Sequence, residues 1–292
     1  MNNTFVIVTW NNQNQIIPLI RSIEKHEPKS RIIIIDNNSS DKTQEVILKY
    51  NSPQIELISL NSNVGFAKAN NIGVANVTTK YVTFINPDCV LVSPLINYLE
   101  NEYQADTGLI GIKILNRNGS LQPSIFKFQR PLSIIVEQFS LGKILPEKLR
   151  TLISPENSRH DRKRSVDWLI GAFFFTSLDK FNNVGGFSED YFLYAEDMDL
   201  CYKYQLKNYK VIFDPSKQIV HIGGTSEKQT NNSKSVKLLN SFCIFARKFH
   251  LKGNIKALYY SYLIKEKVFK FVDKQRSSRY GKNVAFLKEK LK

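Results

Sequence analysis

Apolar, β-branched runs alternate with helically spaced stretches over the first 85 residues. The apolar runs occupy residues 4–10, 31–35, 55–60 and 81–85. A continuous apolar run is typical of a strand that is covered on both faces, as in a parallel sheet. Residues 15–26 instead place Ile16, Leu19, Ile20 and Ile23 on one side of a helix. This order predicts an α/β domain with a mainly parallel central sheet and helices on both faces.

Polar residues follow each of these four predicted strands. They are Thr9 and Asn11, residues 36–41, Asn61 and Asn63, and residues 86–88. In open α/β sheets, ligands bind at the carboxyl ends of the strands. A turn explains one polar strand end, but four at the same edge of a sheet predict a binding site.

Asp36 and Asp88 are carboxylates at this predicted edge. Asp36 either forms a turn or accepts a hydrogen bond from the N3–H of a uracil or thymine ring. Asp88 follows Pro87, which removes a backbone donor and favours an extended residue before it. A turn is a sufficient explanation for Asp88 as well. The alternative is a ligand for Mg²⁺ or Mn²⁺ that bridges a diphosphate.

Further candidates lie late in the chain. Glu196, Asp197 and Asp199 stand among aromatic residues. They either form the polar side of a surface helix or are partly buried, and burial raises the pKa of a carboxylate toward that of a useful general base. His221 ends an apolar run before two glycines. It is either structural or a metal ligand, and imidazole suits Mn²⁺ better than Mg²⁺.

Composition and cysteine spacing predict a cytoplasmic globular protein. Of the 292 residues, 42% are hydrophobic. The longest apolar run, residues 168–175, is shorter than the ~18–20 residues of a membrane span, and no signal-peptide pattern opens the chain. Cys89, Cys201 and Cys243 show no CxxC spacing, so we expect no disulfide framework.

The net charge of +15 indicates an anionic partner. Residues 247–292 are rich in Lys and Arg and contain only three acids. We expect residues 240–292 to form basic amphipathic helices that either lie on an anionic membrane surface, at the inner face of the cell membrane, or pack on the domain. Nucleic acid is a weaker alternative, because no binding motif occurs and the acids at the predicted ligand edge would repel phosphates.

Seven segments together resemble the inverting family 2 glycosyltransferases of GT-A fold, especially their bacterial rhamnosyltransferase-like and galactofuranosyltransferase-like branch. In order, they are IVTWNN, IIDNNSSD, NSNVGFAKANNIG, FINPDC, DWLIGAFFF, VGGFSEDYFLYAEDMDLCYK and HIGGTS. Neither GxGxxG nor GxxxxGK[ST] occurs, which disfavours a Rossmann dehydrogenase or a P-loop enzyme. The resemblance covers about residues 5–226. It implies a glycosyltransferase domain at residues 1–239, with a nucleotide-sugar half at 1–115 and an acceptor and catalytic half at 116–239.

The resemblance also implies roles for single residues. The nucleotide-sugar would be held by Thr9, Asn11, Asp36, Asn63, Gly65, Asn71 and Asp88. Asp88 and His221 would bind Mg²⁺ or Mn²⁺, although Asn86 replaces the first acid of the family's Asp-x-Asp element. Asp197 would be the catalytic base, with Glu196 beside it. The acceptor would face Trp168, Gly171 and Asp199.

The expected reaction is transfer of a sugar, with inversion, from a nucleoside-diphosphate-sugar to a glycan or polyprenyl-diphosphate-linked acceptor in bacterial surface polysaccharide synthesis. dTDP-rhamnose is the first candidate donor, and a UDP-hexose or UDP-galactofuranose is the second. The alternative is a nucleotidyltransferase acting on sugar phosphates. That reaction would need a Gly-rich loop with a Lys or Arg after the first strand, and residues 9–15 contain neither.

Overall fold

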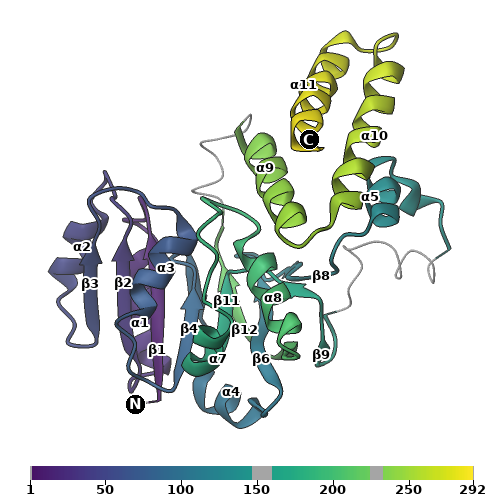
Figure 1. Cartoon of the computed structure of the whole chain (residues 1–292). Helices are drawn as coiled ribbons and strands as arrows, with labels where there is room; N and C mark the ends of the chain where they lie inside the picture. The colour runs from purple at the N-terminus through teal and green to yellow at the C-terminus, as the bar shows by residue number, and fades with distance from the viewer. Residues whose placement is uncertain (1, 147–159, 224–232, 292) are drawn as a thin grey trace. The chain divides into compact units, whose positions relative to one another are not determined.

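The computed structural model describes residues 2–146, 160–223 and 233–291 (Figure 1). The chain divides into two compact units. Unit 1 comprises Met1–Ile125 and Arg159–Asn231, and unit 2 comprises Phe126–Ser158 and Asn232–Lys292. Unit 2 thus adds the segment from Phe126 to the C-terminal helices. The domain boundary predicted at residues 239 and 240 stays a prediction. Residues 224–226 of the HIGGTS segment lie outside the described residues.

The first half of the sheet in unit 1 is parallel. It consists of β1 (Asn3–Thr9), β2 (Arg31–Asp36), β3 (Ile55–Ser59) and β4 (Tyr81–Ile85), in the order β3-β2-β1-β4. These are the four strands expected from the apolar runs. Every residue of β1 and β4 is buried, as the continuous apolar pattern requires.

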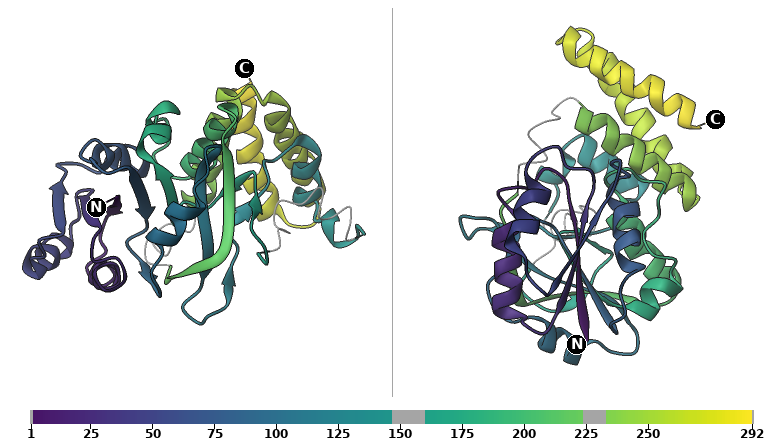
Figure 2. Two further views of the ribbon diagram at one scale, coloured as in Figure 1. Left: turned by 90° about the horizontal axis from the view of Figure 1, so that it is seen from below. Right: turned by 90° about the vertical axis from the view of Figure 1, so that its left-hand side faces the viewer.

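The helices between these strands cover both faces of the sheet (Figures 1 and 2). They are α1 (Ile16–His26), α2 (Thr43–Tyr50) and α3 (Phe66–Val74). Phe5 and Ile7 of β1 pack in one core cluster with the apolar side of α1. Val6, between them, faces α3, where a Cβ built on Gly73 would lie 2.7 Å from its Cγ1. The alternation of side chains along the strand places one helix on each face.

Beyond β4 the sheet becomes mixed. β11 (Phe173–Ser177) pairs antiparallel with β4, and β6 (Thr107–Leu115) follows it. β12 (Lys210–His221) runs parallel to β6 and pairs antiparallel with β5 (Cys89–Leu91) at the far edge. The fold class is confirmed, with the qualification that the sheet combines a parallel half and a mixed half.

Short elements complete unit 1. Paired short strands are β7 (Leu121–Gln122), β8 (Ile125–Phe126, whose second residue begins unit 2), β9 (Arg164–Ser165) and β10 (Trp168–Leu169). The further helices are α4 (Ile96–Glu102), α7 (Leu178–Asn183) and α8 (Glu196–Leu206). α8 is the helix that carries the three clustered acids.

Unit 2 is helical. It contains α5 (Pro131–Gln138), the 3₁₀ turn η1 (Leu141–Lys143), α9 (Ser233–Lys248), α10 (Lys252–Phe269) and α11 (Lys274–Leu291). Its own apolar core joins α5, α9, α10 and α11 through residues that include Ile134, Cys243, Ile255 and Leu287. Among the described residues, no helix has the length and apolar character needed to cross a lipid bilayer.

Candidate functional site

Asp36 and Thr9 are register partners at the ends of β2 and β1. The Asp36 side chain is buried, and its Oδ2 accepts hydrogen bonds from the Ser39 backbone N (3.0 Å) and from Nε2 of Gln44 (2.6 Å). Its Oδ1 is buried and has no hydrogen-bond partner among the described residues. A buried carboxylate oxygen without a hydrogen bond costs free energy. This oxygen can therefore accept a hydrogen bond from an N–H of a ligand.

Thr9 and Asn11 hold the polar loops around Asp36. The Thr9 hydroxyl donates to Oδ1 of Asn12 (3.2 Å), and Oδ1 of Asn11 accepts from the Ser40 backbone N (2.8 Å). Asn11 has a φ of 56°, which an asparagine adopts more readily than most residues. The structure therefore places both residues at the predicted edge, where their side chains bind the loops after β1 and β2.

Asn63 and Gly65 belong to a loop that Asn37 fixes. Asn37 donates from Nδ2 to Oδ1 of Asn63 (3.0 Å), and its Oδ1 accepts from the Val64 backbone N (2.9 Å). Gly65 has a φ of 86°, and a Cβ there would lie 2.7 Å from the Phe192 carbonyl oxygen. Glycine is therefore required on both counts. Sequence reasoning did not single out Asn37, although it lies in the polar run after β2.

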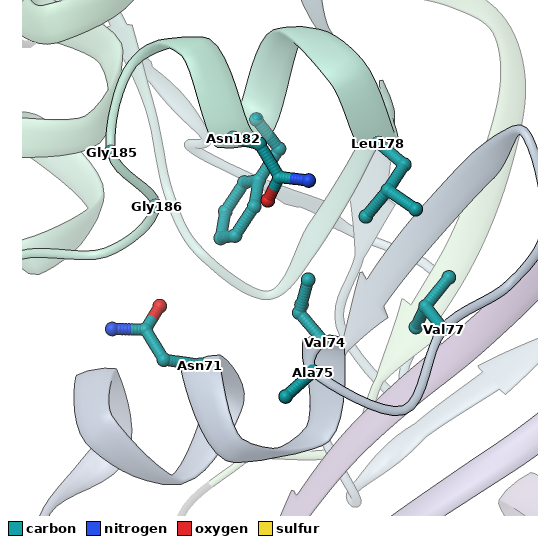
Figure 3. Close-up of a pocket in the computed structure, with 9 residues that line it drawn as sticks. Asn71, Val74, Ala75, Val77, Leu178, Asn182, Gly185 and Gly186 are labelled. Carbon is teal, nitrogen blue, oxygen red and sulfur yellow. The ribbon is translucent and has the colours of Figure 1, made fainter.

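Asn71 joins α3 to the glycine-rich segment before α8. Its Nδ2 donates to the Phe187 carbonyl (2.9 Å) and to Oε1 of Glu189 (3.0 Å), and its Oδ1 accepts from the Phe187 backbone N (3.0 Å). Figure 3 shows Asn71 facing Gly186 at one side of a hollow of about 410 Å³ that α3, α7 and the glycine turn line. No titratable side chain lines this hollow, so it offers no group for proton transfer.

Asp88 and His221 meet at the edge formed by β5 and β12. His221 is the register partner of Cys89, and its Nε2 lies 3.1 Å from Oδ1 of Asp88. The other ring nitrogen, Nδ1, lies 3.0 Å from Oε1 of Gln122 on β7. Both partners are acceptors, so a cation bound between Nε2 and Asp88 would let the ring keep its proton on Nδ1, toward Gln122. Gln122 carries no signal in the sequence, because its hairpin brings it there.

The donor atoms at this pair fit a divalent cation. A carboxylate oxygen and an imidazole nitrogen lie together, and both residues are partly buried. The Sγ of Cys89 lies within 4.8 Å of the other two ligand atoms. Burial raises the pKa of the Cys89 thiol well above its ordinary range, which disfavours the thiolate that binds metals. Of these three residues, Asp88 and His221 therefore offer the donor atoms that fit a divalent cation best.

The acidic cluster forms the first turn of α8. Two residues in left-handed conformation precede the helix, Tyr194 (φ 70°) and Ala195 (φ 68°). Such strain in non-glycine residues gathers at functional sites. Asp197 accepts from two backbone N–H groups, with Oδ1 2.8 Å from the N of Met198 and Oδ2 3.1 Å from the N of Gly171.

Burial raises the pKa of both adjacent acids, Asp197 and Glu196. It raises the pKa of Asp197 to about 6, although the N–H groups of Met198 and Gly171 oppose the rise. Burial and the neighbouring Asp197 charge raise the pKa of Glu196 to about 8, and its Oε2 is buried with no hydrogen-bond partner among the described residues. Burial and mutual repulsion therefore let the pair keep one proton near neutral pH, which divides acid and base character between the two carboxyls.

Asp199 is fully buried and anchors the segment before the helix. It accepts from the hydroxyls of Ser188 (2.5 Å) and Tyr191 (2.9 Å), and Nζ of Lys203 lies 3.8 Å away. Asp199 would therefore affect an acceptor only indirectly, by fixing the position of the segment that contains Ser188 and Tyr191. Trp168 lies on β10, partly buried, three residues before Gly171.

Gly171 and Ala172 connect the first turn of α8 to the pair formed by Asp88 and His221. The N–H of Gly171 donates to Asp197, while the carbonyl of Ala172 accepts from the backbone N of Asn86 (3.1 Å). Asn86 begins the turn that presents Asp88, since its carbonyl accepts from the N of Cys89 (3.1 Å). Two adjacent residues thus fix both the candidate base and the candidate metal acid.

Comparison with known proteins gives a consistent result. Glycosyl transferase family 2 matches residues 4–199, about two thirds of the chain. The rhamnosyltransferase WbbL of Escherichia coli K12 is 27% identical over 265 residues, covering 87% of this chain and 91% of that protein. The N-acetylglucosaminyl-diphospho-decaprenol L-rhamnosyltransferase of Mycobacterium tuberculosis (strain CDC 1551 / Oshkosh) is 27% identical over 215 residues, covering 68% of each chain.

Solved structures share the fold. GalNAc-T7 with UDP, GalNAc and Mn²⁺ aligns with a TM-score of 0.61 and 15% identity over 85% of this chain, which spans 48% of that protein. The mannosyltransferase PcManGT from Pyrobaculum calidifontis, in complex with GDP-Man and Mn²⁺, aligns with a TM-score of 0.58 and 15% identity over 97% of this chain and 75% of its own. The fold is therefore GT-A, and the family match covers the ends of β1 to β4 and the acidic turn of α8, but not His221. The chain belongs to glycosyl transferase family 2.

Proposed function

We propose that this glycosyltransferase moves a sugar, with inversion, from a nucleoside-diphosphate-sugar to an acceptor hydroxyl, with Asp197 as the base. The observation that supports this most is the state of Asp197. Its carboxylate is held by two backbone N–H groups and its pKa is raised to about 6. A base with a pKa near the working pH combines ionisation with proton affinity.

In this mechanism the acceptor hydroxyl gives its proton to Asp197 while its oxygen attacks the anomeric carbon. The bond between that carbon and the diphosphate breaks on the opposite face. The N–H groups of Gly171 and Met198 orient the carboxylate before the reaction, and Glu196 stays neutral beside it. The transition state would have oxocarbenium character, as in glycoside cleavage.

Asp88 and His221 would hold Mg²⁺ or Mn²⁺ at the diphosphate. When bound, the ion supplies positive charge that stabilises the departing nucleoside diphosphate. Gln122 keeps the His221 ring oriented for this role.

Asp36 would receive the base of the nucleotide. Its free, buried Oδ1 matches the ring N–H of uracil or thymine. We therefore infer a UDP- or dTDP-linked donor. The loop with Asn63 and Gly65, fixed by Asn37, and the Asn71 contact would border the rest of the donor.

Rhamnose is the first candidate sugar, because both relatives described above are named rhamnosyltransferases. The name of the mycobacterial relative includes a diphospho-decaprenol acceptor. We infer that the acceptor here is likewise a glycan or a polyprenyl-diphosphate-linked sugar of bacterial surface polysaccharide. Such a lipid acceptor would place the enzyme at the inner face of the cell membrane, with the basic helices of unit 2 at the lipid surface.

The test is a donor screen followed by a product assay. A panel of dTDP- and UDP-sugars with Mn²⁺ is measured by thermal shift, since a ligand of the folded state raises apparent stability. The stabilising donor is then incubated with acceptors, with Asp197→Asn as the inactive control. Release of nucleoside diphosphate supports sugar transfer. Release of pyrophosphate from a sugar phosphate and a nucleoside triphosphate would replace the proposal with a nucleotidyltransferase.

A further inference from the structure

The last two helices form an antiparallel hairpin whose inner faces are already used. α10 and α11 run side by side (Figure 1), with the rings of Tyr262 and Tyr280 stacked at 5.9 Å and the Ser277 hydroxyl bonded to the Glu266 carbonyl (2.9 Å). Ile255 and Leu287 lie in the core of unit 2. The amphipathic faces predicted from sequence are therefore occupied by packing within the unit.

A second set of apolar side chains remains exposed. Phe271 and Val272, in the turn between the two helices, are 89% and 78% exposed. Tyr260, Ile264 and Val268 continue from this turn down the outer side of α10, each about half exposed. Their spacing of four residues places them on one face of the helix. A contiguous exposed apolar patch marks an interaction site, whereas scattered exposed apolar residues do not.

Positive charge surrounds this patch, which we call the hairpin tip and define as residues 260, 264, 268, 271 and 272. Asn232–Lys292 contains 16 of the 41 lysines and arginines and three of the 26 acids, so its net charge is +13 of the total +15. Lys267, Lys270 and Lys274 are exposed beside the tip. Two acids lie near the tip. Asp273 is engaged by Arg276, at its Nε (3.2 Å) and at its backbone N (3.0 Å), and the Glu266 carboxyl lies beside Gly281 of α11.

We infer that the hairpin tip is a membrane-docking element that inserts shallowly into an anionic lipid bilayer. Apolar side chains gain by entering the acyl region, and the lysines then lie at the level of the anionic headgroups. Nucleic acid offers the charge but no apolar phase for Phe271 and Val272. A second copy of the chain offers apolar surface but the same positive charge. An anionic bilayer satisfies both properties.

The inference deepens the proposed membrane location and rests on it, but not on the transfer reaction. It assigns binding to the turn between α10 and α11 and to the adjoining outer side of α10, rather than to every helix of unit 2. The contact would then be small and reversible, since it buries five side chains and no spanning segment.

The test is co-sedimentation of the full chain with vesicles of phosphatidylcholine alone or mixed with phosphatidylglycerol. We expect binding only to the anionic vesicles. The double variant F271S/V272S should weaken that binding about tenfold or more, because it removes most of the apolar surface of the turn. Its matched control is L48S/L206S, which removes two exposed leucines of unit 1, 65% and 61% exposed, and should bind like the parent.

A charge pair of variants completes the design. K267Q/K270Q/K274Q should weaken binding about a hundredfold from the loss of three cations near the surface. K29Q/K42Q/K49Q removes the same charge from exposed positions of unit 1 and should have a much smaller effect. A tryptophan at the tip, F271W, should be quenched by brominated lipids, whereas L48W should not. This readout requires no loss of binding and so holds even where a serine variant folds poorly.

Several results would overturn the inference. They are equal binding of F271S/V272S and L48S/L206S, equal binding to neutral and anionic vesicles, and a dimer of the parent that F271S/V272S abolishes. Transfer to a soluble acceptor separates the two proposals. Its absence in a parent that binds vesicles contradicts the proposed function alone, and unquenched F271W in an active enzyme contradicts the hairpin tip alone.

Discussion

Nε2 of His221 lies 3.1 Å from Oδ1 of Asp88, although 133 positions separate the two residues in the chain. The antiparallel pairing of β12 with β5 creates this contact, because it sets His221 opposite Cys89. Gln122 then holds the far side of the ring from a third strand. Three strands therefore preorganise a nitrogen and an oxygen donor, which lowers the cost of binding a cation.

Metal binding should depend on this pair. Asp88→Asn and His221→Ala should each abolish the Mn²⁺-dependent thermal shift, and chelation should abolish transfer by the parent. Gln122→Leu keeps both donors but frees the ring, so we expect a 10–100-fold weaker Mn²⁺ affinity, roughly the effect of losing an outer-shell partner. Mn²⁺ titration by electron paramagnetic resonance measures all three. Undiminished affinity in His221→Ala would remove that residue from the site.

Replacing the base should affect turnover and spare donor binding. Asp197→Asn keeps the shape of the side chain and removes the acceptor of the proton, so kcat should fall by about 10²–10⁴-fold. The thermal shift with donor should persist. Asp179→Asn, at an exposed acid of α7, is the matched control and should retain activity. A variant at Asp197 with parental kcat would move the base to another group.

The rate should fall on the acid side near pH 6. In the proposed mechanism Asp197 acts in its ionised form, and burial raises its pKa to about 6, so protonation below that pH would remove the base. The acid limb of kcat/KM should therefore have a midpoint near pH 6. Glu196→Gln should leave this midpoint nearly in place, since Glu196 is already protonated when Asp197 titrates. An acid limb below pH 5 in both proteins would contradict the assignment.

Stability should decrease as pH rises, partly through Glu196. Its pKa is higher in the folded state, about 8, than in the unfolded chain, so its contribution is complete below its ordinary range and is lost as pH rises through 8. Glu196→Gln stays neutral at every pH. Its free energy of unfolding should therefore rise relative to that of the parent between pH 5 and pH 8.5, by on the order of a few kcal/mol. Urea unfolding at the two pH values measures the difference. A gain that is the same at both would show that Glu196 does not titrate as stated.

Gly65→Ala should be more harmful than the equivalent change at Gly119. Both glycines have a similar positive φ, 86° and 80°, so both variants incur backbone strain. At Gly65, a Cβ also meets the Phe192 carbonyl at 2.7 Å, whereas nothing lies within 4 Å at Gly119. We expect Gly65→Ala to lose about 1–3 kcal/mol of stability more than Gly119→Ala, because of this overpacking, and to bind donor more weakly. Thermal unfolding and donor titration test this, and equal losses would refute the contact.

The sequence predicted the parallel half of the sheet closely because β1, β2 and β4 are almost entirely buried and so read as continuous apolar runs. β4 occupies residues 81–85, the same bounds as its apolar run. The antiparallel entry of β11 beside β4 was not predicted, although the FFF run at residues 173–175 is as apolar as any strand. Local pattern identifies a strand but not its partner, since pairing is decided by contacts distant in the chain.

The residues of the candidate site were likewise only partly predictable from the sequence. Asp36 and Asp88 follow recognisable strands, so their common edge could be inferred. The contacts of Gln122 and Asn37 could not be inferred, because both depend on turns that bring separate segments together. Asp199 carried the same sequence signal as Asp197, yet it lies fully buried on Ser188 and Tyr191. Helix position separates these acids, since residues two apart in a helix point in different directions.

The dipeptide at residues 171–172 has a stereochemical consequence. Inversion requires the attacking oxygen and the departing phosphate to stand on opposite sides of one carbon atom, at a separation that chemistry fixes. In the proposed mechanism, one backbone segment just before β11 would contact the carboxylate on the attacking side and the turn on the departing side. Residues 171–172 would thus set the distance between the base that activates the nucleophile and the turn that holds the leaving group. Insertion of one residue in this segment would disturb the alignment of nucleophile, anomeric carbon and leaving group.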